Sequence, residues 1–430
     1  MYKEEPDESF LQASEAVEEA RCSMRWADLL VLLPAAPHHL AAFPFAALFR
    51  YLCASGRLTP TARYIFLLAG GCLLAGTALG SYAVLLLIPA AGSVLVLLSV
   101  SPARVHTSVF TLQMSWQTLC HLGLSSQELD PQDARPAAAL SAIMLLTQKA
   151  TSLALDIHEG VVQLQPGQGL LRHALPLCSY LLFFPALLGG PLCSFSRFRG
   201  QAEAAGAAPR PLRGAGQRCL CALALRGLRG GLAGCPALRL PPRLWAQALL
   251  LRLAYYGHWA LDEALLEVAG LGPEAGQGDL SLQDLWTLET THRLAVFSRT
   301  WNKSTSRWLR RLVFQRCPAH PLLATFAFSA WWHGLRPGHV FGFLCWAVVL
   351  EADYRIHPLL GAHATSRGAK VFYRGTTWVF TQLLVAYIMV AVETESFSKL
   401  CLLWTSCNSI LPLSYCLALL LLLVKKPKQS

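Results

Sequence analysis

Forty consecutive residues, 64–103, contain no Asp, Glu, Lys or Arg. A charge near the centre of a bilayer costs about 2.5 to 3.5 kcal/mol on insertion scales, and about 20 apolar residues suffice for a helix to cross. The run is therefore long enough for two membrane-spanning helices. Gly80 and Ser81 lie near its middle, where their residue types favour a turn, so we predict a hairpin of two spans.

Long apolar runs continue through the rest of the chain. Only 14% of the residues are charged and 54% are hydrophobic, whereas soluble domains carry roughly 25% charged residues. The run at 173–196 contains Pro185 and Gly189-Gly190-Pro191, which predict a kinked or re-entrant element. We therefore predict an all-α, polytopic integral membrane protein with about 10 to 12 transmembrane or re-entrant helices. Other candidate spans lie at 105–127, 317–335, 375–392 and 400–424, with less pure ones at 27–50, 137–157, 244–268 and 338–357.

Charged residues are concentrated in a few segments outside these runs. Residues 1–23 carry seven acidic and two basic side chains and are expected to be a disordered extension. Residues 197–243 are rich in Arg, Gly and Pro, and residues 271–316 are rich in Arg, so both are predicted to be cytosolic loops. Residues 425–430 form a basic tail. This division leaves 24–424 as the predicted membrane domain.

The net charge of +11 would favour nucleic-acid binding in a soluble protein. Here the basic residues lie between apolar runs and report topology, so we expect membrane lipid and no nucleic acid around the protein. The 14 cysteines are scattered, and the closest pair, Cys219 and Cys221, has no partner pair at metal-ligand spacing. We expect neither a metal site nor a disulfide framework.

One histidine lies within an otherwise uncharged run. His333 belongs to the run at 317–335 and lies about 16 Å from Leu322 along a helix, near the middle of a bilayer. An imidazole takes up a proton near neutral pH, so His333 is a candidate general base. A histidine that bonds to a neighbouring helix for packing would explain the same position.

The basic segment 271–316 contains a second candidate, Asn302, with Arg299 one helical turn before it. This spacing lets an amide and a cation face one ligand, and the seven basic residues between 292 and 316 favour an anionic ligand. A basic face on anionic lipid, and an asparagine that only caps a helix, are alternatives. Asn302 also begins a glycosylation sequon, which a cytosolic location would leave unmodified.

These two motifs occur together in a known family. Arg299-Thr-Trp-Asn302 in a basic loop, followed by Trp331-Trp-His333-Gly in an apolar run, resembles the membrane-bound O-acyltransferases. The resemblance implies helices around a central tunnel, His333 as the catalytic histidine and Asn302 as the second signature residue. It also implies acyl-CoA as a co-substrate, without a bound cofactor. It covers most of the chain except 1–23 and 200–243.

Other segments resemble one branch of this family, which acylates a serine near the amino terminus of a peptide-hormone precursor. That branch implies octanoyl-CoA as the donor, the peptide precursor as the acceptor and the endoplasmic reticulum membrane as the location. A lysophospholipid acyltransferase of the same family, and a non-catalytic transporter or scaffold, are alternative functions. The resembling segments are 43–45, 114–117, 179–190, 298–314 and 326–354.

Two aromatic residues are candidates for the end of the acyl tunnel. Phe326 lies seven residues before His333, on the same helix face and about 10 Å away, which matches the length of an extended eight-carbon chain. Trp346 on the next apolar segment is placed to close the same cavity. Ordinary aromatic core packing is the alternative for both residues.

Overall fold

All regular secondary structure in the described residues of the computed structural model is helical, which confirms the all-α prediction. The predicted extension 1–23 and the tail 425–430 lie outside the described residues. The described residues are 36–125, 133–163, 170–190, 193–204, 212–233, 243–272, 281–394, 396–405, 409–410 and 412–417.

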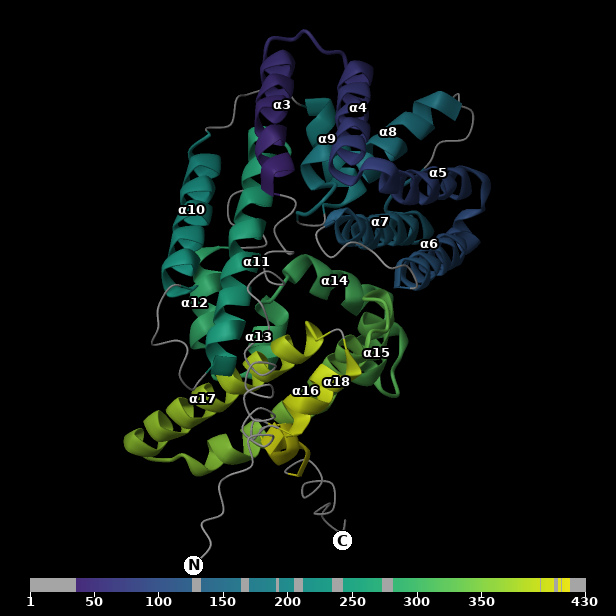
Figure 1. Ribbon diagram of the computed structural model, residues 1–430. Coiled ribbons are helices and arrows are strands. Elements are labelled where there is room, and N and C mark those ends of the chain that lie inside the picture. The colour runs from purple at the N-terminus through teal and green to yellow at the C-terminus, as the bar shows by residue number, and fades with distance from the viewer. Residues whose placement is uncertain are drawn as a thin grey trace, which may run out of the picture.

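The helices form two neighbouring bodies that α11 joins (Figure 1). In the described residues α11 packs against α3 at one body and against α17 at the other. The first body contains α3 (Ala36–Ala54), α4 (Pro60–Leu79), α5 (Ala83–Ser99), α6 (Pro102–Ser125), α7 (Arg135–His158), α8 (Leu170–Leu182) and α9 (Phe195–Ala204). α10 (Arg213–Ala233) and α11 (Arg243–Val268) follow, and the second body contains α12 (Leu282–Thr290), α13 (Leu294–Thr300), α14 (Lys303–Leu312), α15 (Pro321–Trp332), α16 (Pro337–His363), α17 (Arg367–Val392) and α18 (Phe397–Thr405).

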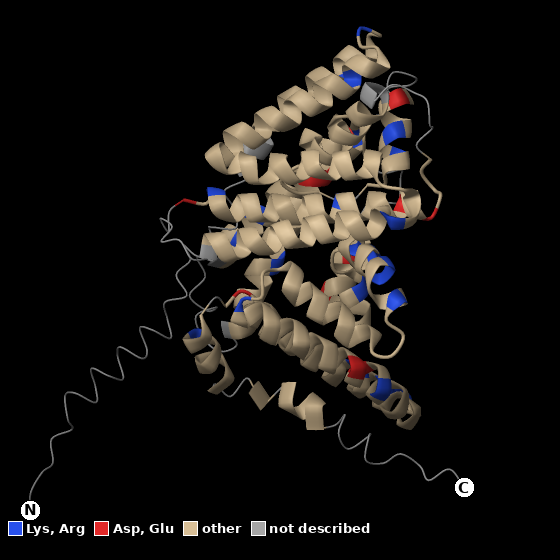
Figure 2. Ribbon diagram, turned by 90° about the vertical axis from the view of Figure 1, so that its right-hand side faces the viewer, with Lys and Arg blue, Asp and Glu red and all other residues tan. Residues whose placement is uncertain are grey.

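Most of the helical ribbon carries no charged residue, as Figure 2 shows. Three helical segments among the described residues are long and apolar enough to cross a membrane: Pro60–Ser99, Arg135–His158 and Arg367–Val392. Shorter apolar helices lie at Ala41–Ala54 and His173–Leu182. The fold is thus that of a multi-pass membrane protein, and the number of 10 to 12 crossings stays a prediction.

The forty-residue uncharged run turns where the sequence predicts. Leu79 ends α4, Gly80 has a φ of 57°, and a short 3-10 helix at Gly80–Tyr82 leads into α5. The two helices do not form the predicted hairpin, because α5 leads sideways away from the end of α4 and does not return along it (Figure 1). Leu79 and Tyr82 both keep right-handed helical torsions, so Gly80 alone, with a positive φ that glycine adopts readily, redirects the chain.

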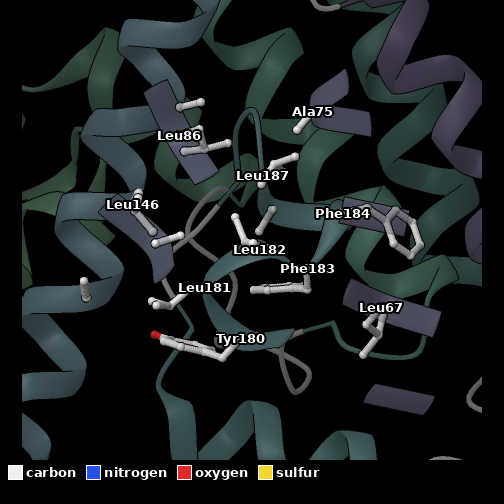
Figure 3. Packing of buried hydrophobic residues seen from close by; sticks show 14 of the residues in the cluster. Leu67, Ala75, Leu86, Leu146, Tyr180, Leu181, Leu182, Phe183, Phe184 and Leu187 are labelled. Carbon is white, nitrogen blue, oxygen red and sulfur yellow. The ribbon is translucent and has the colours of Figure 1, made fainter. Parts of the chain in front are cut away.

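The predicted break in 173–196 is present. α8 ends at Leu182, and a 3-10 turn follows at Phe184–Ala186. Lys149 on α7 donates a hydrogen bond to the carbonyl of Ala186, which satisfies a backbone group that the broken helix leaves free. The break is nevertheless well packed: Figure 3 shows Tyr180, Phe183 and Phe184 among Leu67, Leu86 and Leu146 from α4, α5 and α7.

The loop predicted at 197–243 is helical where it is described. α9 ends at Ala204, and α10 spans Arg213–Ala233 and packs along α11. Buried Ala222 lies in one apolar cluster with Ala260 and Leu261 of α11. Arg, Leu and Ala are good helix formers, and the small residue at the contact lets the two helices approach closely, so the Arg and Gly content did not prevent a helix.

The predicted basic loop at 271–316 also contains helices. Ser281 begins α12 with a reciprocal capping box that it forms with Asp284. Two further short helices, α13 and α14, follow and pack against α16 and α7. Their hydrophobic sides contain Leu294, Phe297 and Trp308, which are at most 3% exposed. The composition correctly indicated a polar segment but not that its apolar side chains anchor it to the body.

Candidate functional site

His333 occupies the turn between α15 and α16. It is the C-cap of α15, and Gly334 follows with a φ of 102°. The N–H of Gly334 donates to Trp331 O and the N–H of Leu335 to Ala330 O, both at 3.0 Å. This pair of bonds is a Schellman motif, in which glycine supplies the left-handed residue. The sequence WWHG thus ends the helix at the histidine.

His333 therefore ends a helix and does not lie within one, and its position near the middle of the membrane stays a prediction. α15 has 12 residues, or roughly 18 Å, which is too short to cross a hydrocarbon layer of about 30 Å. A turn at the end of so short a helix can still lie deep in the membrane. Gly334 is the signal that the sequence offered for this turn, because glycine is enriched directly after helix ends.

Aromatic side chains surround the His333 ring. The ring centroids of Trp332 and Phe343 lie 4.9 Å from that of His333, and the centroid of His339 lies 5.4 Å away. His339 and Phe343 are four residues apart on α16, so they face the turn together. Sequence reasoning missed both, although their spacing places them on one helix face. The arrangement shields a half-buried imidazole from bulk water while leaving part of it accessible.

A third histidine approaches the same turn from α6. A Cβ added to Gly334 would lie 2.5 Å from Nδ1 of His121, so only glycine fits here. Among the described residues, three buried nitrogens at the turn have no hydrogen-bond partner: His121 Nε2, His339 Nδ1 and Trp332 Nε1. Unpaired buried polar atoms are costly, and a polar ligand would satisfy them. The described His, Cys, Asp and Glu residues nowhere form a group of three suited to hold a metal ion.

Asn302 begins α14 with left-handed torsions, φ 44° and ψ 68°. Its Oδ1 accepts a hydrogen bond from the N–H of Thr305 at 3.2 Å. Asparagine tolerates the left-handed region better than other residues with a Cβ, and its side chain suits the N-cap. The capping role considered from sequence is thus present, with the Asn302 amide nitrogen not used in the cap.

α14 connects Asn302 to the histidine turn by packing. The ring of Trp308 lies 4.9 Å from Trp332, and Trp308 Nε1 donates to Thr151 Oγ1 of α7 at 3.0 Å. Arg311 at the other end of α14 bonds Asp156 and Glu159, each at 2.6 Å, and this contact lowers the pKa of the Glu159 carboxyl. The described contacts do not join the side chains of Asn302 and His333 directly. They place the two residues on helices that pack together.

Arg299 lies on the exposed side of α13. Its Nε donates to Ala295 O at 2.9 Å, and its guanidinium lies 6.0 Å from the centre of the Tyr354 ring. α13 itself is held by Asp353 of α16, a fully buried carboxylate that accepts hydrogen bonds from the N–H groups of Leu294 and Ala295 at 3.3 Å. Asp353 was not identified from sequence as a support for this segment.

The two proposed tunnel residues lie near each other. The rings of Phe326 on α15 and Trp346 on α16 are 6.4 Å apart. The ring centroids of Trp346 and Phe297 of α13 lie 5.9 Å apart. Phe297 in turn stacks on Trp301, with ring centroids 5.7 Å apart. An aromatic path therefore runs from the middle of α15 to the residue before Asn302. Trp346 Nε1 is another buried nitrogen without a partner among the described residues.

One family model and several known proteins match the sequence of this chain. The model of the membrane-bound O-acyltransferase family matches residues 241–390, which include Asn302, Phe326, His333 and Trp346. The chain is 48% identical to the membrane-bound ghrelin O-acyltransferase of Rattus norvegicus over 94% of this chain and all of the relative. The Mus musculus protein of the same name is also 48% identical, over 95% of this chain and all of its own length. A membrane-bound glycerophospholipid O-acyltransferase 1 of Mus musculus is 26% identical over 82% of this chain and 83% of its own. The chain therefore belongs to the membrane-bound O-acyltransferase family.

Proposed function

We propose that the protein transfers an octanoyl group from octanoyl-CoA to a serine hydroxyl near the amino terminus of proghrelin, in the endoplasmic reticulum membrane. The observation that carries this proposal is the 48% identity to two ghrelin O-acyltransferases over essentially the whole chain. Identity to the glycerophospholipid enzyme is only 26%. The peptide acceptor is therefore the better supported of the two acceptors that the family offers.

In this proposal His333 takes the proton of the acceptor serine as its oxygen attacks the thioester carbonyl. The new ester C–O bond forms, the thioester C–S bond breaks, and the imidazolium returns its proton to the CoA thiolate. The histidine lies at the C-terminus of α15. Partial negative charge at a helix C-terminus stabilises the imidazolium that forms during transfer. No nucleophile of the enzyme is needed.

Asn302 and Arg299 are proposed to hold the donor. Arg299 is exposed and its guanidinium suits a CoA phosphate. Oδ1 of Asn302 caps α14 and leaves the amide nitrogen available to donate as far as the described residues go, because a side-chain amide has two separate hydrogen-bonding ends. The left-handed backbone then fixes where this amide points. This division places donor binding on α13 and α14 and proton transfer at the turn after α15.

Phe326 is proposed to end the acyl chain. Replacing Phe326 with Ala should shift the preferred donor from eight carbons to a chain longer by a few carbons, because removing a ring opens space beside Trp346. The measurement is initial rate against a series of acyl-CoA lengths. Phe328→Ala is the matched control. Phe328 lies on the same helix but packs on Trp308, so its loss should lower the initial rate with every donor by a similar factor. A uniform loss in Phe326→Ala would identify the residue as packing.

A microsomal assay tests the proposed function itself. Membranes that contain the wild-type chain should attach octanoate to a peptide of the proghrelin amino terminus when octanoyl-CoA is added. Membranes with the His333→Ala chain, matched for protein amount, should not. A peptide whose acceptor serine is replaced by alanine controls for the site of attachment. If wild-type membranes that contain the folded chain yield no acylated peptide, the proposal is wrong.

A further inference from the structure

Hydrogen bonds between buried polar side chains link α5, α6 and α7. Gln113 on α6 donates to Ser93 Oγ at 2.6 Å and to Pro89 O at 3.1 Å. Thr147 on α7 donates to Gln117 Oε1 at 2.8 Å, and its hydroxyl also lies within 3.3 Å of Gln113 Oε1. Ser93, Gln113, Gln117 and Thr147 are all at most 1% exposed. Polar residues inside apolar helices are costly unless they are paired, and they mark functional positions. The two glutamines lie one helical turn apart, so their partners can be compared directly.

Only one of the two glutamines reaches the histidine turn. Gln117 Nε2 donates to the backbone carbonyl of Trp332, the last residue of α15. Carbonyls in the last turn of a helix have no intrahelical donor. The Schellman turn satisfies the carbonyls of Ala330 and Trp331 but not that of Trp332. Gln117 supplies a side-chain amide donor to it from a different helix, and the His121 ring on the same helix also bonds the Trp332 backbone.

This bond fixes the peptide unit that carries the histidine. Gln117 holds the C=O of the peptide that joins Trp332 to His333, and the N–H of the same peptide donates to Ser329 O at 3.0 Å. Both polar groups of one peptide plane are thus held, one by α6 and one by α15. Because Thr147 in turn fixes the Gln117 amide, the plane cannot rotate without breaking a buried hydrogen bond.

We propose that Gln117 is a positioning residue for His333, which sets the direction of the imidazole by fixing the Trp332–His333 peptide plane. The proposal rests on the proposed function, in which His333 is the base. Gln117 touches neither donor nor acceptor in it and acts only through the backbone. A base must lie within hydrogen-bond reach of the proton it accepts, and a displacement of about 1 Å can cost about 10²-fold in rate.

The test compares two matched variants, Gln117→Met and Gln113→Met. Methionine keeps most of the volume of glutamine and removes the donor, and both sites are equally buried. Initial rates are measured in membranes against octanoyl-CoA and against the proghrelin peptide, normalised to the amount of enzyme that remains monodisperse in detergent. Gln117→Met should lower kcat about tenfold to 10²-fold while KM for octanoyl-CoA changes less than about twofold. Gln113→Met should change kcat less than about threefold.

The split between kcat and KM distinguishes positioning from packing. Equal losses of kcat in both variants, an unchanged kcat in Gln117→Met, or a change only in KM would each overturn the proposal. The same pair is assayed with a lysophospholipid acceptor, because the position of His333 does not depend on the acceptor. If the wild-type chain acylates only the lipid, the proposed function fails. The ratio of the two variants on the lipid then still decides the role of Gln117.

Discussion

Replacing His333 with alanine is expected to lower acyl transfer by at least about 10² to 10⁴, the range attributed to general acid–base catalysis. Octanoyl-CoA should still bind, because the proposed donor contacts lie on α13 and α14 and not in the turn after α15. Binding is measured with labelled octanoyl-CoA in membranes, and turnover with the proghrelin peptide in the same preparation. Loss of transfer without loss of binding is the expected result.

His363 provides the matched control for this experiment. It is also a histidine at a helix end, where its Nδ1 lies 2.7 Å from Leu359 O, but it is exposed and belongs to the far end of α16. His363→Ala should retain full activity. If His333→Ala kept full turnover with unchanged donor affinity, the base mechanism would be wrong and a transporter or scaffold would become the better description.

The second large effect is expected at Asn302, where two variants separate two roles. Asn302→Asp keeps a side-chain oxygen that can cap the N–H of Thr305 and tolerates the left-handed backbone, but it loses the amide donor. If the amide holds the donor, Asn302→Asp should lose about 10- to 10²-fold in kcat/KM and bind octanoyl-CoA more weakly, with little change in thermal stability. Near-normal activity would reduce the residue to a helix cap.

Combining substitutions tests whether Asn302 and His333 act on one transition state. Asn302→Ala removes both the cap and the amide, and it costs backbone strain, because alanine is disfavoured at a φ of 44°. The activity of the double variant Asn302→Ala with His333→Ala should be close to that of the more damaged single variant. Losses in residues that act as a unit do not multiply. Fully multiplicative losses would indicate independent roles.

The sequence predicted the presence of the helices more accurately than the positions of their ends, and one of these ends carries His333. Uncharged runs located α4 to α6, α15 and α17 because the cost of burying charge in lipid acts residue by residue, and the less pure runs at 137–157 and 338–357 located α7 and α16. The uncharged run 317–335 placed a break only at Arg336, three residues after the position where α15 ends at His333. Hydropathy does not detect a helix that ends inside an apolar run. Gly334 was the local sequence signal for the end of the helix. Its close contact with His121 of α6 depends on how the helices pack, so the sequence does not indicate it.

The same limit explains the errors in the polar segments. α10 was assigned to a loop because its arginines and glycines lower the mean hydropathy, whereas its contact with α11 depends on small residues such as Ala222. Residues 292–316 were seen as a basic surface, although Phe297 and Trp308 bury their rings. Composition averages over both faces of a short helix. Supports such as Asp353 and Gln117 come from distant helices, so no spacing in the sequence indicates what they hold.

A competition between two acceptors decides whether the chain acylates a peptide or a lipid. Membranes containing the wild-type chain receive octanoyl-CoA together with equal concentrations of the proghrelin amino-terminal peptide and a lysophospholipid, and both products are quantified by mass spectrometry. His333→Ala membranes give the background. We expect octanoyl peptide well above that background and octanoyl phospholipid at the background level. Octanoyl phospholipid without octanoyl peptide would contradict it and would assign the chain to the lipid-acylating members of the family.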